Sequence, residues 1–215
     1  RERPVIALAR DKAFCFYYAD GLSELARQGA ELVEFSPLED KALPTGCSGL
    51  YLGGGYPEVF AKELAGNTSL LREIHHAILH GMPTVAECGG FLYLQRHLAD
   101  ADGRYDWKMV GAFSGKAGNT GKLSRFGYIE MTARADGLLC GAGERLHAHE
   151  FHYWDSTTPG GDFRAQKPLS DRGWDCAWHT PTLYAGFPHF HFGGCPEAAA
   201  RFVTACIAYE RGREG

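Results

Sequence analysis

The chain has 215 residues, 45% of them hydrophobic and 22% charged, which is the composition of a folded domain, and we expect residues 1–215 to form one domain. The formal net charge of −4, with no basic stripe, argues against nucleic acid as a partner. No apolar run reaches the roughly 18 residues of a membrane span, and the N-terminal stretch lacks a signal-peptide core, so we expect a soluble, cytoplasmic protein.

Short apolar runs alternate with helical patterns in the first half. The runs predict strands at residues 5–10, 31–36, 49–54 and 83–87, and the patterns predict helices at 18–30, 67–81 and 89–98. Strands and helices in this alternation are typical of right-handed βαβ units, in which a parallel sheet is covered by helices.

Capping residues delimit two of these helices. In the first, three apolar residues recur at helical spacing and a glycine follows: Leu22, Leu25, Ala26 and Gly29. The second is expected to be capped by Asn67 or Thr68 and to end at Gly81.

The pattern changes near residue 100. Short segments punctuated by glycine, at 108–115, 126–134 and 149–156, indicate strands and loops, and a helix is expected at 196–212. The fold class predicted is therefore α/β, with a mostly parallel central sheet flanked by helices and a β-rich, loop-rich second half.

Cys88 lies where the fourth strand should turn into a helix. At the carboxyl end of a parallel strand, the sulfur of such a residue is exposed and the helix N-terminus lowers the pKa of the thiol. The N–H groups of Gly89 and Gly90 could then hold an oxyanion, as in the elbow of serine hydrolases. The alternative is a small buried cysteine. Seven cysteines without a CxxC pair indicate reduced thiols in either case.

A second glycine-rich turn follows the third strand. Gly53, Gly54 and Gly55 lack the lysine and hydroxyl residue of a phosphate loop, so we interpret them as a second wall of N–H groups facing Cys88. Tyr56 and the proline after it should stiffen this turn.

Histidines near the end of the chain supply a candidate base. His189 and His191 alternate with two phenylalanines as on a strand, which places both imidazoles on one side. A second polar group contains His147, His149, Glu150 and His152. These residues could suggest zinc, but the ligand spacing of a structural zinc site is missing, so we predict no metal.

Several long motifs occur in an order that resembles a known family: "LARDKAFCFYYADGL", "EFSPLED", "LYLGGGYPE", "AECGGFLYL", "MVGAFSG", "RFGYIE", "HEFHYW" and "HFHFGGCPEAAARF". The chain resembles the C-terminal glutaminase domains of cobyrinic and hydrogenobyrinic acid a,c-diamide synthases, which are triad glutamine amidotransferases. The resemblance covers nearly the whole chain. It implies a class I glutamine amidotransferase-like, flavodoxin-like fold.

The resemblance also implies a two-stage chemistry. The glutaminase domain would release ammonia from glutamine through a γ-glutamyl thioester. An N-terminal synthetase domain, covalently linked or separate, would use the ammonia to amidate the a and c carboxylates of a corrinoid. This chain contains no such domain and no GxxxxGK[ST] loop, so ATP and Mg are expected only on the synthetase domain, and no cofactor is expected here.

Individual roles follow from matched motifs. Cys88 matches the nucleophile and His189 the base. Many triad amidotransferases carry a glutamate two residues after the histidine, where this chain has His191 instead, so the third triad member stays open among His191, Glu87 and Glu150. The expected oxyanion and glutamine site comprises Gly53, Gly54, Gly55, Gly89 and Gly90. The expected pocket or channel residues are Tyr56, Arg125, His149, His152 and Tyr153.

Two other functions stay open at this point. The chain could be a non-catalytic docking or regulatory module on the same fold. It could also be a cysteine hydrolase of this fold that acts on another small molecule.

Overall fold

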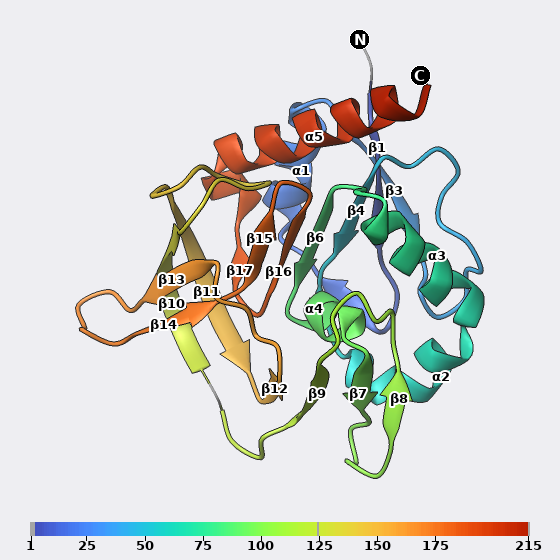
Figure 1. Ribbon diagram of the computed structural model, residues 1–215, viewed down its shortest axis with the longest axis vertical. Coiled ribbons are helices and arrows are strands. Elements are labelled where there is room, and N and C mark those ends of the chain that lie inside the picture. The colour runs from blue at the N-terminus through green and yellow to red at the C-terminus, as the bar shows by residue number, and fades with distance from the viewer. Residues whose placement is uncertain (1–2, 124, 215) are drawn as a thin grey trace.

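The computed structural model describes residues 3–123 and 125–214. Within these residues, the central sheet has six strands in the order β15-β16-β6-β4-β1-β3 (Figure 1). Their bounds are Val5–Ala9 (β1), Glu31–Phe35 (β3), Gly49–Leu52 (β4), Thr84–Glu87 (β6), Trp178–Thr180 (β15) and Leu183–Gly186 (β16). All neighbours pair in parallel except the edge strand β15. The predicted mostly parallel α/β sheet is thus confirmed.

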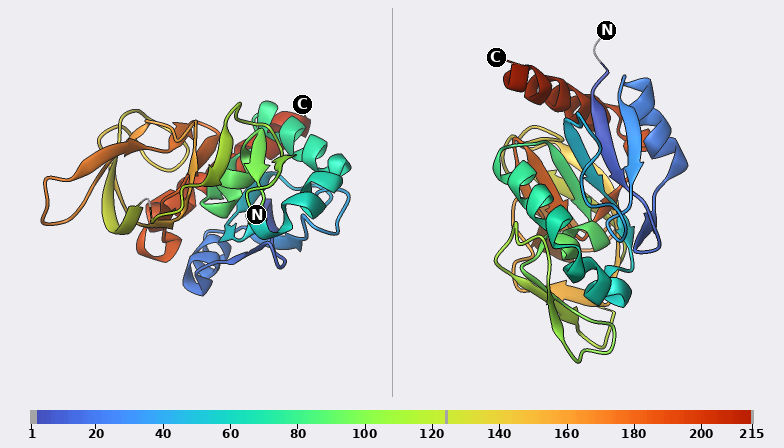
Figure 2. Two further views of the ribbon diagram at one scale, coloured as in Figure 1. Left: turned by 90° about the horizontal axis from the view of Figure 1, so that it is seen from below. Right: turned by 90° about the vertical axis from the view of Figure 1, so that its right-hand side faces the viewer.

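Successive side chains of each central strand pack into two different hydrophobic cores. In β1, Ala7 and Ala9 join the core under α2 (Ala61–Gly66), α3 (Thr68–Leu79) and α4 (Gly89–Leu94). Ile6 and Leu8 join the core on the opposite face, beneath α1 (Ala19–Arg27) and α5 (Pro196–Glu214). Figure 2 shows α1 and α3 on opposite sides of the sheet. Because both faces are buried, inner strands such as β1 and β4 are almost continuously apolar rather than alternating.

A second sheet covers part of the α5 side. Its strand order is β14-β13-β10-β11-β17, and its strands span Arg125–Ala133 (β10), Arg145–His152 (β11), Phe163–Gln166 (β13), Gly173–Cys176 (β14) and His189–Phe190 (β17). Buried side chains of β10 and β11 belong to the same core as Ile6 and Leu8. The second half is therefore β-rich, as predicted, and packs directly on the central sheet (Figure 1).

Two smaller sheets complete the fold. One has the order β12-β9-β7-β8, with strands His97–Ala99 (β7), Asp106–Lys108 (β8), Lys116–Asn119 (β9) and Trp154–Ser156 (β12). The other pairs Phe14–Phe16 (β2) with Gly54–Gly55 (β5). Short 3-10 helices occupy Pro57–Phe60 and Phe192–Gly194. In the described part of the chain, no helix has both the length and the apolar character needed to cross a bilayer.

Three local predictions were wrong. The helix after Cys88 ends at Leu94, and part of the expected helix is the strand β7. Ala26 is exposed rather than on the buried face of α1. Asn67 stands at the N-cap position of α3, but its side-chain amide donates to the carbonyls of Pro37 and Asp40, 2.9 and 2.7 Å away. The amide therefore fastens a loop instead of capping the helix.

The carboxyl ends of β4, β6 and β16 meet at one edge of the central sheet. Leu52 is level with Ala86, and Gly186 is level with Glu87. The segments that follow these strands carry the glycine triplet, Cys88 and His189, respectively. Parallel strands therefore bring together three motifs that are up to 136 positions apart in the sequence (189 − 53).

We expect Gly90→Ala to destabilise the protein. A Cβ at Gly90 would lie 2.1 Å from the backbone oxygen of Leu52, so α4 could no longer pack this closely on β4. Overpacking of this kind costs about 1–3 kcal/mol and outweighs the better helix propensity of alanine. Gly212→Ala in α5, where a Cβ meets nothing within 4 Å, is the matched control. Urea denaturation of both variants measures the difference, and equal stabilities would contradict the packing argument.

Candidate active site

Cys88 stands at a sharp turn between β6 and α4. Its backbone angles, φ 50° and ψ −102°, lie outside the regions that non-glycine residues ordinarily adopt. The Cys88 N–H donates to the carbonyl of Gly186 at 2.8 Å, which fastens the turn to the end of β16. A strained turn that lifts a nucleophile above the end of a strand is the geometry of the elbow expected from the sequence.

His189 approaches Cys88 from the second sheet. It is the first residue of β17, and its backbone pairs with His149 of β11. The imidazole side chain is 11% exposed and is a hydrogen-bonding partner of the Cys88 thiol. The two side chains expected to carry the chemistry are thus adjacent, although they belong to different sheets.

Glu87 is the carboxylate beside this histidine. Its Oε2 lies 3.5 Å from Nδ1 of His189, and its Oε1 accepts a 2.6 Å hydrogen bond from the hydroxyl of Tyr51. Glu87 and Val85 share one face of β6, and Val85 is level with Tyr51 on β4, so the strand register places the tyrosine behind the carboxylate. Contact of Glu87 with Nδ1 leaves Nε2 as the ring nitrogen available to the sulfur.

The electrostatics of the pair favour a charged imidazole. Burial alone favours the neutral ring, but hydrogen bonds and charge attraction from Cys88 and Glu87 outweigh it and raise the pKa of His189 to about 10. At neutral pH His189 is therefore an imidazolium, with carboxylate oxygen on one side and sulfur on the other. An imidazolium next to a cysteine is the arrangement that activates a thiol as a nucleophile.

Glycines allow the walls of the site to approach this closely. A Cβ at Gly54 would lie 2.8 Å from Cε1 of His189, and a Cβ at Gly89 would lie 3.0 Å from the nitrogen of Gly55. Gly89 and Gly90 are the first two residues of α4, whose N–H groups have no partner inside the helix. Two glycine-rich segments therefore face each other beside Cys88.

Gly53 has a different position from the other two glycines of its triplet. Its N–H donates to the hydroxyl of Tyr17 at 3.0 Å, and that hydroxyl in turn donates to the carbonyl of Ala9. The Gly53 N–H is thus engaged away from Cys88, which leaves Gly54 and Gly55 as the residues of the triplet that border the site.

A cavity of about 340 Å³ opens over Cys88, a size suited to a small molecule. It is lined by Cys15, Phe16, Gly54, Gly55, Tyr56, Cys88, His149, Phe151 and His189. Two of the expected pocket residues, Tyr56 and His149, thus lie at the cavity. Burial and the nearby His189 lower the pKa of His149, so His149 offers a neutral ring at the cavity wall.

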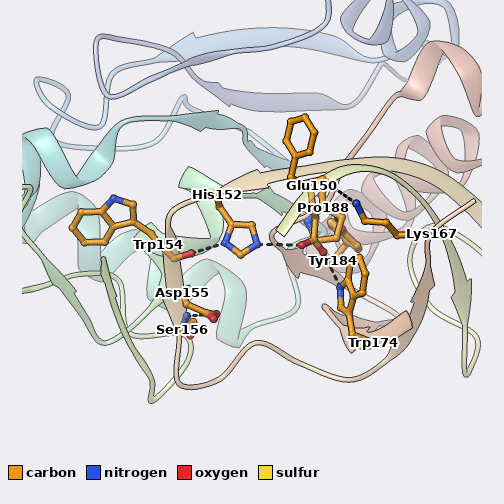
Figure 3. Close-up of polar contacts among 10 residues, drawn as sticks. Glu150, His152, Trp154, Asp155, Ser156, Lys167, Trp174, Tyr184 and Pro188 are labelled. Carbon is orange, nitrogen blue, oxygen red and sulfur yellow. Dashed lines mark hydrogen bonds and ion pairs between the residues drawn. The ribbon is translucent and has the colours of Figure 1, made fainter. Parts of the chain in front are cut away.

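The other two candidates for third triad member lie away from Nδ1 of His189. Glu150 is buried, and its carboxylate contacts Nε2 of His152 at 3.1 Å and the indole nitrogen of Trp174 at 3.2 Å (Figure 3). His191 turns to Asp20, with Nε2 2.6 Å from Oδ1. The structure thus places only Glu87, of the three, against the ring of His189.

Three expected pocket residues do not line the cavity over Cys88. The ring of His152 is buried between Glu150 and the backbone oxygen of Trp154 (Figure 3). It also stacks on the ring of Phe187, with the ring centroids 3.9 Å apart. Tyr153 lies farther along the surface, with its ring against that of Phe151. The third, Arg125, lies over the ring of Trp174 and lines a separate cavity.

Sequence reasoning missed three residues of the site. Tyr51 holds Glu87, Tyr17 holds the glycine triplet, and the exposed Cys15 shares the cavity with Cys88. Tyr51 had a detectable signal, because a tyrosine in the middle of a buried strand needs a partner for its hydroxyl. Cys15 lies in β2, a strand of three residues that the sequence pattern did not reveal, and Tyr17 directly follows it.

The histidine clusters do not form a metal centre in the structure. Among the described residues, no three or more His, Cys, Asp and Glu side chains gather in a way that could hold a metal ion. The histidines singled out from the sequence contact carboxylates, backbone carbonyls and aromatic rings instead.

Solved structures with similar architecture support the fold assignment. A putative GMP synthase subunit from Thermoplasma acidophilum superposes with a TM-score of 0.64 at 16% identity, covering 100% of both chains. A structure of PurLQS from Thermotoga maritima gives a TM-score of 0.60 at 15% identity, covering 97% of this chain and 99% of that one. At these identities the similarity concerns the fold.

Closer relatives are found by sequence. Cobyrinate a,c-diamide synthase of Caldanaerobacter subterraneus is 41% identical over 96% of this chain, and hydrogenobyrinate a,c-diamide synthase of Thermobifida fusca is 42% identical over 95%. This chain spans 46% and 43% of their respective lengths, so the relatives are about twice as long. Residues 5–195 match the CobB/CobQ-like glutamine amidotransferase domain. The chain therefore belongs to the family of CobB/CobQ-like glutamine amidotransferase domains.

Proposed function

We propose that this chain hydrolyses glutamine to glutamate and ammonia, with Cys88 as nucleophile, His189 as proton carrier and Glu87 as the residue that orients His189. The observation that carries the proposal is the row Tyr51, Glu87, His189 and Cys88, which ends at a strained turn inside a cavity. A buried carboxylate, an imidazole and a nucleophile in series form the arrangement of a hydrolytic triad.

The first stage forms a thioester. The Cys88 sulfur attacks the side-chain carbonyl carbon of glutamine, and the carbonyl π electrons move to the oxygen. The N–H groups of Gly55 and Gly89, whose backbones lie against each other, are placed to stabilise this oxyanion. The C–N bond then breaks, and His189 gives its proton to the leaving nitrogen, which departs as ammonia.

The second stage releases glutamate. Neutral His189 takes a proton from water, the resulting hydroxide attacks the thioester carbon, and the C–S bond breaks to return the sulfur as thiolate. Glu87 contacts Nδ1 throughout, which keeps the ring turned toward the sulfur and stabilises its positive charge. The net reaction consumes glutamine and water and yields glutamate and ammonia.

The ammonia would serve the amidation performed by the longer relatives. We propose that this domain works with an ATP-dependent ligase half, linked or separate, to amidate the a and c carboxylates of cobyrinate or hydrogenobyrinate. Support comes from the names of the relatives and from their length, about twice that of this chain. Seven free cysteines favour a reducing compartment, such as the cytoplasm.

Incubation of the protein with glutamine tests the glutaminase proposal. We expect glutamate and ammonia to appear in equal amounts, and asparagine, which is one methylene shorter, to be a much poorer substrate because its amide cannot reach Cys88 from the same binding position. Enzymatic assays of both products measure the reaction. Absence of turnover, alone and with the ligase half, would favour a docking module. Turnover of another amide or ester in preference to glutamine would favour a different cysteine hydrolase.

A further inference from the structure

The outward face of the β10–β11 hairpin carries an unusual set of exposed aromatic side chains. We call the following residues the aromatic face: Phe126, Tyr128, His149, Phe151 and Tyr153. Phe126 is directly opposite Phe151 and Tyr128 is opposite His149, so cross-strand pairs form a continuous surface with ring centroids 5.3–5.8 Å apart. Phe126 is 55% exposed and Tyr128 76%. Contiguous exposed apolar groups of this kind mark interaction surfaces.

The aromatic face is continuous with the catalytic cavity. His149 and Phe151 line the cavity over Cys88. His189 also lines a second cavity of about 600 Å³, whose lining includes Tyr128, His149 and His191. A partner that covers the aromatic face therefore also lies over the cavity in which ammonia would be released.

A basic cavity adjoins the other end of the aromatic face. It measures about 440 Å³ and is lined by Phe126 together with Leu123, Arg125, Lys167, Arg172, Gly173 and Trp174. Within the described residues, Arg125, Lys167 and Arg172 form no ion pair with an acidic side chain, whereas the neighbouring Arg134 and Arg164 share Asp175. Three cations without acidic partners in a chain of net charge −4 indicate a place for an anionic group from outside.

We propose that the aromatic face is the docking surface for the ligase half of the longer enzyme, and that the basic cavity receives a carboxylate side chain of that half. The inference rests on the proposed function. Three observations favour this occupant: relatives carry a second half of similar length, the surface borders the cavity over Cys88, and its cations without acidic partners suit an acidic group. Docking there shields ammonia from water and buries the exposed rings in a single step.

Substitutions of exposed residues can test the surface without changing the catalytic groups. Phe126→Glu places a negative charge on the aromatic face, and Arg172→Glu reverses a charge in the basic cavity. Both side chains are exposed, so folding should be retained. Leu79→Glu in α3, 72% exposed, and Arg104→Glu between β7 and β8 make the same changes elsewhere on the surface.

The assay uses the complete enzyme, this chain together with its ligase half. It records amide formed per glutamine hydrolysed, amidation supported by added ammonium chloride, and glutamine hydrolysis by this chain alone. We expect Phe126→Glu to lower the amide formed per glutamine about tenfold, as for a buried aromatic contact, and Arg172→Glu about threefold, as for a charged contact at an interface. Ammonium-supported amidation and hydrolysis by this chain alone should change less than about twofold, and both control variants should match the wild type.

Distinct results overturn the two proposals. If Phe126→Glu and Arg172→Glu form as much amide per glutamine hydrolysed as the control variants, the aromatic face is not the docking surface. If the wild-type chain neither hydrolyses glutamine alone nor supports glutamine-dependent amidation in the complete enzyme, the proposed function itself fails. The remaining possible occupant is a second copy of this chain, and sedimentation of this chain alone tests it. If the chain dimerises, and Phe126→Glu dissociates the dimer without lowering the amide formed per glutamine hydrolysed, the surface belongs to a second copy. Protection of β10 amides from hydrogen exchange in the complete enzyme, relative to this chain alone, is the independent supporting result.

Discussion

Cys88→Ala is expected to abolish glutamine hydrolysis, with a loss in kcat on the order of 10³-fold or more. Without the sulfur no thioester can form, and the remaining groups can only polarise the amide and position water. The fold should survive, because the substitution removes one atom at the surface of a cavity. Glutamate release, followed enzymatically, and circular dichroism, followed during thermal unfolding, together separate lost chemistry from lost structure.

Cys15→Ser is the matched control for this experiment. Cys15 is exposed and lines the same cavity, so a glutamine-like electrophile could reach it as well as Cys88. We expect Cys15→Ser to retain activity and labelling, and Cys88→Ala to lose both. Mass spectrometry identifies the modified peptide. A label found on Cys15 and not on Cys88 in the wild-type protein, or full turnover by Cys88→Ala, would remove Cys88 from the mechanism.

Glu87→Gln is expected to lower kcat by about 10²–10⁴-fold with little change in KM, because an amide cannot both hold the correct tautomer of His189 and stabilise its charge. The side chain is buried against Tyr51 and keeps its shape in the variant, so the loss is electrostatic. Removing the carboxylate also lowers the pKa of His189 from its value of about 10. NMR titration of the imidazole measures that shift directly.

Glu150→Gln and His191→Asn are the controls that separate the three candidates for the third triad member. Neither side chain contacts Nδ1 of His189, so we expect both variants to keep the pKa of His189 and to retain kcat within about tenfold. Tyr51→Phe should lower kcat in the same direction as Glu87→Gln but by less, because only one hydrogen bond to the carboxylate is lost. An unchanged pKa and kcat in Glu87→Gln would show that His189 works without a carboxylate.

The same residues predict how stability depends on pH. The pKa of His189 is raised above its ordinary value of 6.5, so its interactions stabilise the folded state fully below pH 6.5, and this contribution is lost as the pH rises through about 10. Glu87→Gln should weaken that dependence. Urea denaturation at several pH values between 6 and 10 compares the two slopes.

The core of the fold could be predicted from the sequence because its strands are strongly patterned. Continuous apolar runs at 5–9 and 49–52, and the mostly apolar run at 83–86, are typical of strands buried on both faces, and each contributes to a parallel strand of the central sheet. Short elements escaped detection, because β2 and β5 have three and two residues and are held by pairing with each other rather than by local propensity.

The candidate site was only partly predictable, for a physical reason. Cys88 and His189 stand in motifs whose spacing could be interpreted residue by residue. The role of Glu87 depends on which face of β6 it occupies and on how the backbone turns at φ 50° one residue later, and neither is visible in the sequence. Arg125 and His152 had suitable chemistry, but tertiary packing directs them to Trp174 and Glu150 instead.

Short connections join the two sheets: Phe187 and Pro188 link the end of β16 to the start of β17, and Ala177 links β14 to β15. Glu87 is the last residue of β6 in the central sheet and Cys88 follows it directly, whereas His189 is paired with β11 of the other sheet. The distance between nucleophile and base is thus a property of the packing between two layers rather than of one loop. We therefore expect turnover to be sensitive to substitutions in the hydrophobic core between the two sheets, even when every residue of the cavity is kept.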